Sequence, residues 1–368
     1  MLSVFCSPHR YVQGKGAILS LGEELTYLGC KDPVLIITSK SADKLLKDSW
    51  KKTFDKVSMK YIIHYFNGES SEEEIELIKS LVKKNEVKTV VGAGGGKVID
   101  TARAVARGLD LPVISCPTIA SSDSPCSALS VIYKKNGDFD HYSIHNKNPD
   151  LVLVDTEIIA KSPLRFLVAG MGDALATFFE AVTCVEGNKK NMRGGLPTQA
   201  SLALAKLCYE TLLESGVQAC QDVGAKKVTP DLEKIVEANT LLSGLGFESC
   251  GLAAAHAIHN GLTVIPEAHS YLHGEKVAFG TLTQLVLEEK EQSLIEKVLH
   301  FATQIGLPVS LNQLGIKDPT KEVAEIIAKR ACAEGETIYN EPFEIRVSDI
   351  ADDILKANEI GRTYLSNI

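Results

Sequence analysis

Short apolar runs alternate with amphipathic stretches over the first 155 residues of the chain. Residues 34–37 read VLII, a run typical of a strand buried on both faces, and a helical pattern follows from about Ala42. Residues 57–65 are again strand-like. Ser71 and Glu74 have the spacing of a capping box at the head of an amphipathic helix. Because strands and helices alternate in this way, we expect an α/β fold with a parallel sheet.

Two further strands are expected in this part of the chain, at residues 112–115 and 151–154. Residues 129–133 and 139–144 flank Asn136-Gly137, a pair that favours the tight turn of an antiparallel hairpin.

After about residue 160 the apolar spacing becomes that of helices. Ser162 and Thr229 each precede a proline, the arrangement of an N-cap with proline at the first helical position. Gly244 and Gly246 are expected to break a helical run. We predict two domains, an α/β domain over residues 1–160 and an all-α domain over residues 161–368. The helices expected in the second domain cover residues 170–182, 198–215, 230–243, 273–287, a segment from about 321, and 349–364.

The composition is that of an ordinary globular protein, because 45% of the 368 residues are hydrophobic. A net charge of −8 with scattered basic residues argues against a nucleic-acid partner. The nine cysteines are odd in number and dispersed, as is typical of reduced thiols in a cytoplasmic protein. No signal peptide is visible, and no stretch approaches the roughly 18 apolar residues of a membrane span. We therefore expect a soluble cytoplasmic protein without a membrane partner.

Residues 88–106, KTVVGAGGGKVIDTARAVA, predict a β-branched strand, a glycine-rich turn and a helix. Glycines at such a turn let backbone N–H groups approach an anion, and the start of the helix favours negative charge. A Walker A loop would need glycine at Val91 and Ser or Thr at Val98. The dinucleotide pattern begins at Gly92 and Gly94 but meets Lys97 at its third position. We expect a phosphate group here, but not that of ATP.

Residues 116–133, CPTIASSDSPCSALSVIY, combine small hydroxylated side chains with one carboxylate, Asp123. This composition is typical of a loop that binds a polar ligand, and equally of a surface loop.

Four of the nine histidines, His256, His259, His269 and His273, lie between residues 251 and 280. Imidazole is the commonest transition-metal ligand, so we expect two of these four to bind a metal, although spacings of three and four residues also arise by chance. The small residues around His256 leave room for a ligand to approach the backbone.

Asp173 lies early in an apolar helical stretch, and Glu180 follows seven residues later near the same face. Asp173 would be either a capping or dipole residue of that helix, or the third ligand that two histidines need.

Together these segments resemble the glycerol dehydrogenases of the iron-containing (group III) alcohol dehydrogenase family over nearly the whole chain. The matching stretches are SPHRYVQGKGA, VGAGGGKVIDTA, PTIASSDSPCSALSVIY, GMGDALATFFEA, EANTLLSGLGFES, GLAAAHAIHNGLT and HGEKVAFGTLTQLV. The resemblance implies a Rossmann-like nucleotide-binding domain, a helical domain as in dehydroquinate synthase-like folds, and a divalent metal in the cleft between them.

Carried over residue by residue, the resemblance implies that Asp173, His256 and His273 bind the metal and that His259 and His269 do not. Asp123 would contact the polyol substrate. The residues implied at the cofactor are Ser39 at the ribose, Gly94, Gly95, Gly96 and Lys97 at the pyrophosphate, and Thr118, Ser121, Ser127, Leu129 and Tyr133 at the adenosine and nicotinamide ends.

The implied reaction transfers a hydride from the secondary hydroxyl of glycerol to NAD and yields dihydroxyacetone. Two imidazoles and one carboxylate suit Zn²⁺ as well as Fe²⁺, and the resemblance favours zinc. In the family an aspartate follows the first strand and binds the ribose, but here Ser39 and Lys40 stand at that place. Because the lost carboxylate removes repulsion toward a 2′-phosphate, NADP or dual use is a second expectation. The resemblance also implies a ring-like homo-oligomer, up to an octamer.

Two alternatives stay open at this stage. One is a related dehydrogenase or reductase that acts on another small vicinal diol or hydroxyketone. A phosphorylated substrate would need a basic residue near Asp123, and the segment SSDSPCS has none. The other is a catalytically silent nucleotide-binding protein of the same fold, against which the complete set of one Asp and two His argues.

Overall fold

The computed structural model describes residues 1–135, 137 and 139–368, which form two compact units. We call residues 6–163 with 222–244 the sheet unit, and residues 1–5, 164–221 and 245–368 the helical unit. The chain leaves the sheet unit after Pro163, near the boundary predicted at residue 160, but residues 222–244 return to it.

The sheet unit contains a six-stranded sheet in the order β1-β8-β5-β4-β2-β3, in which every neighbouring pair is parallel. A separate antiparallel hairpin pairs β6 with β7, as predicted, although Asn136, which we expect in its turn, lies outside the described residues. The strands are β1 (Tyr11–Gly14), β2 (Val34–Thr38), β3 (Tyr61–Tyr65), β4 (Thr89–Gly94), β5 (Val113–Pro117), β6 (Leu129–Tyr133), β7 (Phe139–Ile144) and β8 (Leu151–Asp155).

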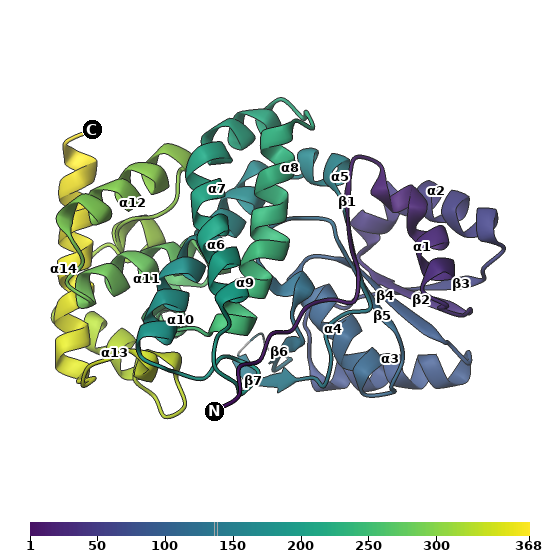
Figure 1. The fold of residues 1–368 in the computed structure, drawn as a ribbon, viewed down its shortest axis with the longest axis horizontal. Helices are drawn as coiled ribbons and strands as arrows, with labels where there is room; N and C mark the ends of the chain where they lie inside the picture. The colour runs from purple at the N-terminus through teal and green to yellow at the C-terminus, as the bar shows by residue number, and fades with distance from the viewer. Residues whose placement is uncertain (136, 138) are drawn as a thin grey trace. The chain divides into compact units, whose positions relative to one another are not determined.

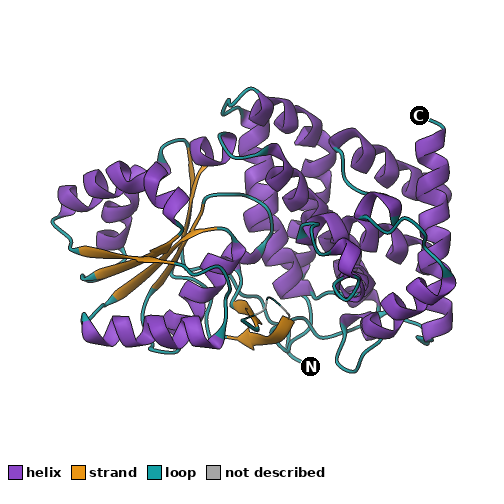
Figure 2. Cartoon of the chain, turned by 180° about the vertical axis from the view of Figure 1, so that it is seen from behind, coloured by secondary structure: helices purple, strands orange, loops and turns teal. Residues whose placement is uncertain are grey.

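Helices cover both faces of this sheet, as Figures 1 and 2 show. On one face Ile36 packs with Trp50 and Phe54, and on the other face Leu35 packs with Ile78. Successive strand residues are therefore buried on opposite faces, which is why VLII forms a continuous apolar run. The helices of the sheet unit are α1 (Leu21–Tyr27) and α2 (Lys40–Val57) on the first face, α3 (Glu72–Lys84) and α4 (Gly96–Arg107) on the second, and α5 (Thr156–Ala160) and α8 (Pro230–Glu237).

Two local predictions need correction. Residues 57–60 are not strand, because α2 runs to Val57 and β3 begins only at Tyr61. The capping box before α3 is half formed: the hydroxyl of Ser71 accepts a hydrogen bond from the N–H of Glu74. The carboxylate of Glu74 instead contacts His64 and accepts hydrogen bonds from Asn67.

The carboxyl ends of β2, β4 and β5 meet at one edge of the sheet. Thr38 at the end of β2 is opposite Ala93 in β4, and Gly94 is opposite Pro117 in β5. The connections from β2 and from β4 pack on opposite faces, through α2 and α4. Such a switch point leaves a crevice at the carboxyl ends of the strands, where α/β proteins bind nucleotides.

The helical unit is built around α6, whose residues are mostly buried. An 18-residue window of this helix has a mean hydropathy of 1.4, so α6 is long and apolar enough to cross a membrane, contrary to our expectation that no such stretch exists. However, 83% of the window is buried inside the protein, as in the core helix of a globular unit. The helices lying wholly or mainly in this unit are α6 (Leu164–Glu186), α7 (Gln199–Gly224), α9 (Ser243–Cys250), α10 (Ala254–Leu262), α11 (His273–Leu287), α12 (Gln292–Ile305), α13 (Lys321–Ala331) and α14 (Val347–Ser366).

The break predicted at Gly244 and Gly246 is wrong, because both glycines lie inside α9. A Cβ atom on Gly246 would lie 2.5 Å from Cγ2 of Thr177, so this glycine permits close packing. The chain turns instead at Gly251, whose φ of 115° favours glycine.

Candidate active site

Three helices of the helical unit approach one another more closely than side chains would normally allow. A Cβ atom on Gly274 in α11 would lie 1.8 Å from the carbonyl oxygen of Ala169 in α6. A Cβ atom on Gly280 would lie 2.3 Å from the carbonyl oxygen of Ala255 in α10. Small residues in this region therefore let helix backbones touch.

The close packing brings together Asp173 from α6, His256 from α10 and His273 from α11. One ligand atom from each residue lies within 4.8 Å of the other two. Oδ1 of Asp173 is 3.0 Å from Nε2 of His273 and 3.3 Å from Nε2 of His256. Asp173 lies well inside α6 and is fully buried, so the alternative of a capping or dipole residue is wrong.

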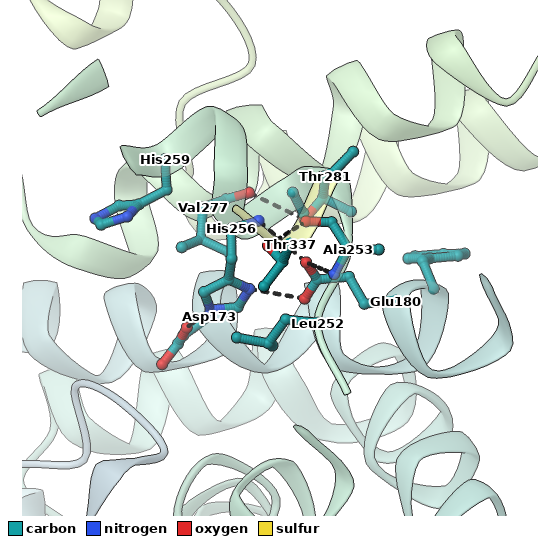
Figure 3. Close-up of polar contacts among 12 residues, drawn as sticks. Asp173, Glu180, Leu252, Ala253, His256, His259, Val277, Thr281 and Thr337 are labelled. Carbon is teal, nitrogen blue, oxygen red and sulfur yellow. Dashed lines mark hydrogen bonds and ion pairs between the residues drawn. The ribbon is translucent and has the colours of Figure 1, made fainter. Parts of the chain in front are cut away.

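Glu180 holds the imidazole of His256 from the side opposite to Asp173 (Figure 3). Its Oε2 atom is 2.7 Å from Nδ1 of His256, and its Oε1 atom accepts hydrogen bonds from the N–H groups of Ala253 and His256. A carboxylate only accepts, so Nδ1 carries a proton, and Nε2 is the nitrogen of His256 that can offer a lone pair to a metal. Sequence reasoning noted Glu180 but assigned it no role.

The N–H groups at the start of α10 are all bound by buried side chains. Besides Glu180, Glu341 accepts from Ala254 and Gln284 accepts from Ala255. The small residues around His256 therefore allow close contact with protein side chains at the positions where we expected a ligand to approach the backbone.

His273 is oriented by a hydrogen bond with His259, a residue that the resemblance excludes as a metal ligand. Nδ1 of His273 is 2.9 Å from Nε2 of His259, and Nδ1 of His259 is 3.1 Å from Oδ1 of Asn260. His269 lies apart from this cluster and contacts the carbonyl oxygen of Thr263.

The electrostatics of the cluster favour an anionic Asp173. Burial alone would raise the pKa of Asp173, but the imidazoles of His273 and His256 outweigh it and hold this pKa below its ordinary value. Burial lowers the pKa of His256, but Glu180 and Asp173 raise it well above the ordinary range. Burial, together with His273 and Lys276, lowers the pKa of His259.

These residues fit a divalent transition metal. They supply two imidazoles and one carboxylate, with donor atoms at mutual distances suited to one ion. The side chain of Asp173 is 1% exposed and that of His273 is 41% exposed, so the cluster is buried on one side and accessible on the other. This is the arrangement of a metal site that keeps a coordination position open.

The glycine-rich turn of the sheet unit fits a phosphate group. Gly94 ends β4, and Gly95, which has no side chain that could cap the helix, is the N-cap of α4. A Cβ atom on Gly94 would lie 2.8 Å from Val98, so the turn requires glycine there. The start of a helix favours an anion, and in this first turn the N–H of Val98 already donates to the carbonyl oxygen of Gly95. Lys97 follows directly, and its Nζ atom lies 2.6 Å from a carboxylate oxygen of Glu69.

Ser39 lies at the same edge of the sheet, directly after β2. Its hydroxyl accepts a hydrogen bond from the N–H of Ala42 and is 2.9 Å from the hydroxyl of Ser41. Ser39 is thus the N-cap of α2, followed by the exposed Lys40.

The loop that carries Asp123 is mostly buried, so the reading of residues 116–133 as a surface loop is wrong. Oδ2 of Asp123 accepts a hydrogen bond of 2.8 Å from the hydroxyl of Ser243, and Asn239 donates to the carbonyl oxygen of Ala120. Both partners belong to the segment that returns to the sheet unit. Among the residues predicted at the cofactor, Thr118 donates its N–H to the carbonyl oxygen of Gly94.

The same loop is also tied to α4 by a buried arginine. Arg103 donates to the carbonyl oxygens of Ser124 and Leu129 and forms an ion pair with Asp100. Ser127 is buried in this segment, whereas Ser121, Leu129 and Tyr133 are partly exposed.

Comparisons with known proteins agree with this arrangement. Residues 8–156 match the family model described as iron-containing alcohol dehydrogenase. The chain is 52% identical to a glycerol dehydrogenase of Thermotoga maritima, with 98% of each chain covered. The chain belongs to the iron-containing alcohol dehydrogenase family.

Two other proteins are also similar over most of their length. A glycolaldehyde reductase of Halobacterium salinarum is 45% identical, with 98% of this chain and 99% of the relative covered. The crystal structure of a glycerol dehydrogenase from Schizosaccharomyces pombe has a TM-score of 0.95 at 34% identity, covering 99% of this chain and 92% of that one. The predicted fold class, a parallel α/β sheet followed by a helical region, is confirmed.

Proposed function

We propose that the protein is a metal-dependent glycerol dehydrogenase that oxidises the secondary hydroxyl of glycerol to the ketone of dihydroxyacetone and passes the hydride to NAD or NADP. The observation that carries this proposal is the meeting of Asp173, His256 and His273 from three helices, with ligand atoms within 4.8 Å of one another. The high identity to a glycerol dehydrogenase supports the choice of substrate.

Asp173, His256 and His273 would hold the metal, for which we propose Zn²⁺, with Fe²⁺ as the alternative that the same donors accept. When bound, such a cation supplies Lewis acidity, which lowers the pKa of an alcohol hydroxyl. Asp173 supplies negative charge from inside the protein. Glu180 keeps the proton of His256 on Nδ1, so that Nε2 is free as a donor.

The cofactor would be held at the carboxyl edge of the sheet, where its nicotinamide would accept the hydride. The N–H groups that follow Gly95 would bind the pyrophosphate, and Lys97 would exchange its contact with Glu69 for a phosphate oxygen. The other residues proposed at the cofactor are Gly94, Gly96, Thr118, Ser121, Ser127, Leu129 and Tyr133.

Ser39 and Lys40 support a cofactor with a 2′-phosphate as well as NAD. The hydroxyl of Ser39 lies at the start of α2, where the family has a carboxylate. Lys40, the next residue, adds a positive charge. We therefore propose dual use of NAD and NADP.

Asp123 would bind a hydroxyl of the polyol. Its Oδ2 atom is oriented by the hydroxyl of Ser243, so the carboxylate is held in place before a substrate arrives. We also propose a cytoplasmic homo-oligomer that is soluble, and only the last of these properties is supported by the burial of the apolar helix α6.

The test is an activity assay on the purified protein with glycerol and with dihydroxyacetone, in which NAD(H) and NADP(H) are compared by nicotinamide absorbance. We expect glycerol-dependent reduction and dihydroxyacetone-dependent oxidation, lost after treatment with a chelator and restored by Zn²⁺. Full activity of metal-free protein would overturn the metal role. Absence of turnover with both substrates in the zinc-loaded protein would overturn the assignment of glycerol.

A second candidate is reduction of another small hydroxycarbonyl compound. It is favoured by the 45% identity to a protein named glycolaldehyde reductase. Glycolaldehyde in the same assay distinguishes the two, because a kcat/KM for glycolaldehyde well above that for dihydroxyacetone would favour the second candidate. A catalytically silent protein would show no turnover with any of these compounds.

A further inference from the structure

A chain of polar contacts leads from His273 to an ion pair that belongs to other elements of the helical unit. Nδ1 of His273 contacts Nε2 of His259 at 2.9 Å, and Nδ1 of His259 contacts Oδ1 of Asn260 at 3.1 Å. Nδ2 of Asn260 then donates to Oε2 of Glu336 at 2.9 Å, and Nη1 of Arg330 donates to Oε1 of Glu336. Arg330 comes from α13, whereas His259 and Asn260 belong to α10.

Arg330 and Glu336, at the far end of these contacts, each have only one possible hydrogen-bonding role. Arginine only donates and a carboxylate only accepts, so Glu336 forces the amide NH₂ of Asn260 to face it. The amide oxygen of Asn260 then faces His259, whose Nδ1 must carry the proton. Nε2 of His259 is left as an acceptor, and His273 must donate from Nδ1. With Nδ1 of His273 protonated, only its Nε2 atom, which lies 3.0 Å from Oδ1 of Asp173, can offer a lone pair to a metal.

We propose that Glu336 is a positioning residue of the metal site, which sets the tautomer of His273 through Asn260 and His259. This inference rests on the proposed metal role of His273. It differs from the contact between Glu180 and His256, where a carboxylate touches the ligand directly. Here Glu336 acts on His273 only through the neutral imidazole of His259 and the neutral amide of Asn260.

The substitution Glu336→Gln keeps the shape of the side chain, but its amide can donate a hydrogen bond to Asn260, whereas the carboxylate only accepts one. If the amide NH₂ of the new glutamine faces Asn260, the amide of Asn260 turns and donates to His259. His259 then donates from Nε2, and His273 is pushed toward the tautomer with the proton on Nε2. That tautomer has no lone pair for a metal at the nitrogen that faces Asp173.

The experiment measures the Zn²⁺ affinity of the full-length protein by competition with a chelator, and the absorption spectrum of the Co²⁺-substituted protein. We expect E336Q to bind Zn²⁺ about 10- to 100-fold more weakly and to show an altered cobalt spectrum. Two variants serve as matched controls: E334Q makes the same charge change at an exposed neighbour, and H269Q removes a histidine outside the chain of contacts. Both controls should bind Zn²⁺ as the wild type does.

The double variant N260D/E336Q moves the carboxylate from position 336 to position 260, so that His259 again has to donate a hydrogen bond from Nδ1. The carboxylate of the aspartate accepts from both His259 and the glutamine, and the glutamine oxygen accepts from Arg330. We expect this variant to regain the affinity and the cobalt spectrum of the wild type. A brace that only holds α10 and α13 together would instead lower the unfolding free energy of metal-free E336Q and leave Zn²⁺ affinity unchanged.

Each outcome decides the inference. Weak Zn²⁺ binding by E336Q with recovery in the double variant supports it, and wild-type affinity in E336Q overturns it. If E336Q does not fold, the double variant decides alone: wild-type affinity supports the role of Glu336, and weakened affinity overturns it. If the wild-type protein itself does not bind Zn²⁺ or Co²⁺, the proposed metal site fails, and the inference fails with it.

Discussion

Replacing Glu180 by glutamine tests how one buried carboxylate prepares His256 for a metal. Glu180 is fully buried and accepts hydrogen bonds from the N–H groups of Ala253 and His256, and from Nδ1 of His256. Glutamine has nearly the same shape, but only its oxygen accepts. If that oxygen keeps the two backbone N–H groups, its NH₂ group faces Nδ1, and the imidazole must carry its proton on Nε2. E180Q therefore blocks the nitrogen that faces Asp173.

The expected magnitude follows from these contacts. Loss of a hydrogen-bond partner behind a metal ligand weakens metal binding by about 10- to 100-fold, or about 1.4–2.8 kcal/mol. A hydrogen bond to a charged group contributes about 1.5–3 kcal/mol to stability, so the unfolding free energy of the metal-free variant should fall by a similar amount. The two losses are separable, because the second does not depend on zinc.

Zn²⁺ affinity is measured by competition with a coloured chelator, and stability by denaturant unfolding of the metal-free protein. Glu186→Gln is the control, because Glu186 is exposed at the end of the same helix. We expect E186Q to match the wild type in both measurements. Zn²⁺ binding by folded E180Q that is as tight as in the wild type would refute the reasoning.

Three further predictions concern other parts of the protein. Ser39→Asp should shift the ratio of kcat/KM for NAD over NADP toward NAD by roughly tenfold or more, because like charges placed together cost several kcal/mol; an unchanged ratio would contradict it. Burial, with Glu288 nearby, raises the pKa of Glu341 to about 9, so the folded protein retains this proton. The associated stability is fully present below the unfolded pKa of roughly 4.3 and is lost as pH rises through about 9. Glu341→Gln should therefore flatten the pH dependence of the unfolding free energy over that range, and an equally steep decline would speak against this. Gly274→Ala would place a Cβ atom 1.8 Å from a backbone oxygen and should cost about 1–3 kcal/mol or more, with weaker Zn²⁺ binding, whereas Gly224→Ala has nothing within 4 Å and should be neutral; equal stability of the two variants would show that the helix contact is not tight.

Patterns within single elements could be predicted well from the sequence. The helix expected over residues 273–287 has these bounds, and Thr229 caps the helix that begins at Pro230. The errors arose where a local signal had two readings. The sequence pattern predicts a helix break at Gly244 and Gly246, but inside α9 a glycine also permits close packing. Ser71 caps α3 as expected, whereas the carboxylate of Glu74 accepts a hydrogen bond from Asn67.

The partners of the proposed metal ligands were beyond reach of the same reasoning. Glu180 lies 76 residues from His256, and Asp173 lies 100 residues from His273. No periodicity links positions so far apart. The role of His259 was also missed, because its contact with His273 depends on how α10 and α11 cross.

The sequence by itself determined the alternation of strands and helices, the glycine-rich turn after β4 and the residue types of the candidate metal site, because these depend on local spacing and side-chain chemistry. Only the tertiary structure decided which carboxylate and which histidine stand behind each proposed ligand. Those contacts form because the helices cross at glycines, where their backbones touch. The direction of each hydrogen bond is then set by whether the partner side chain can donate or accept.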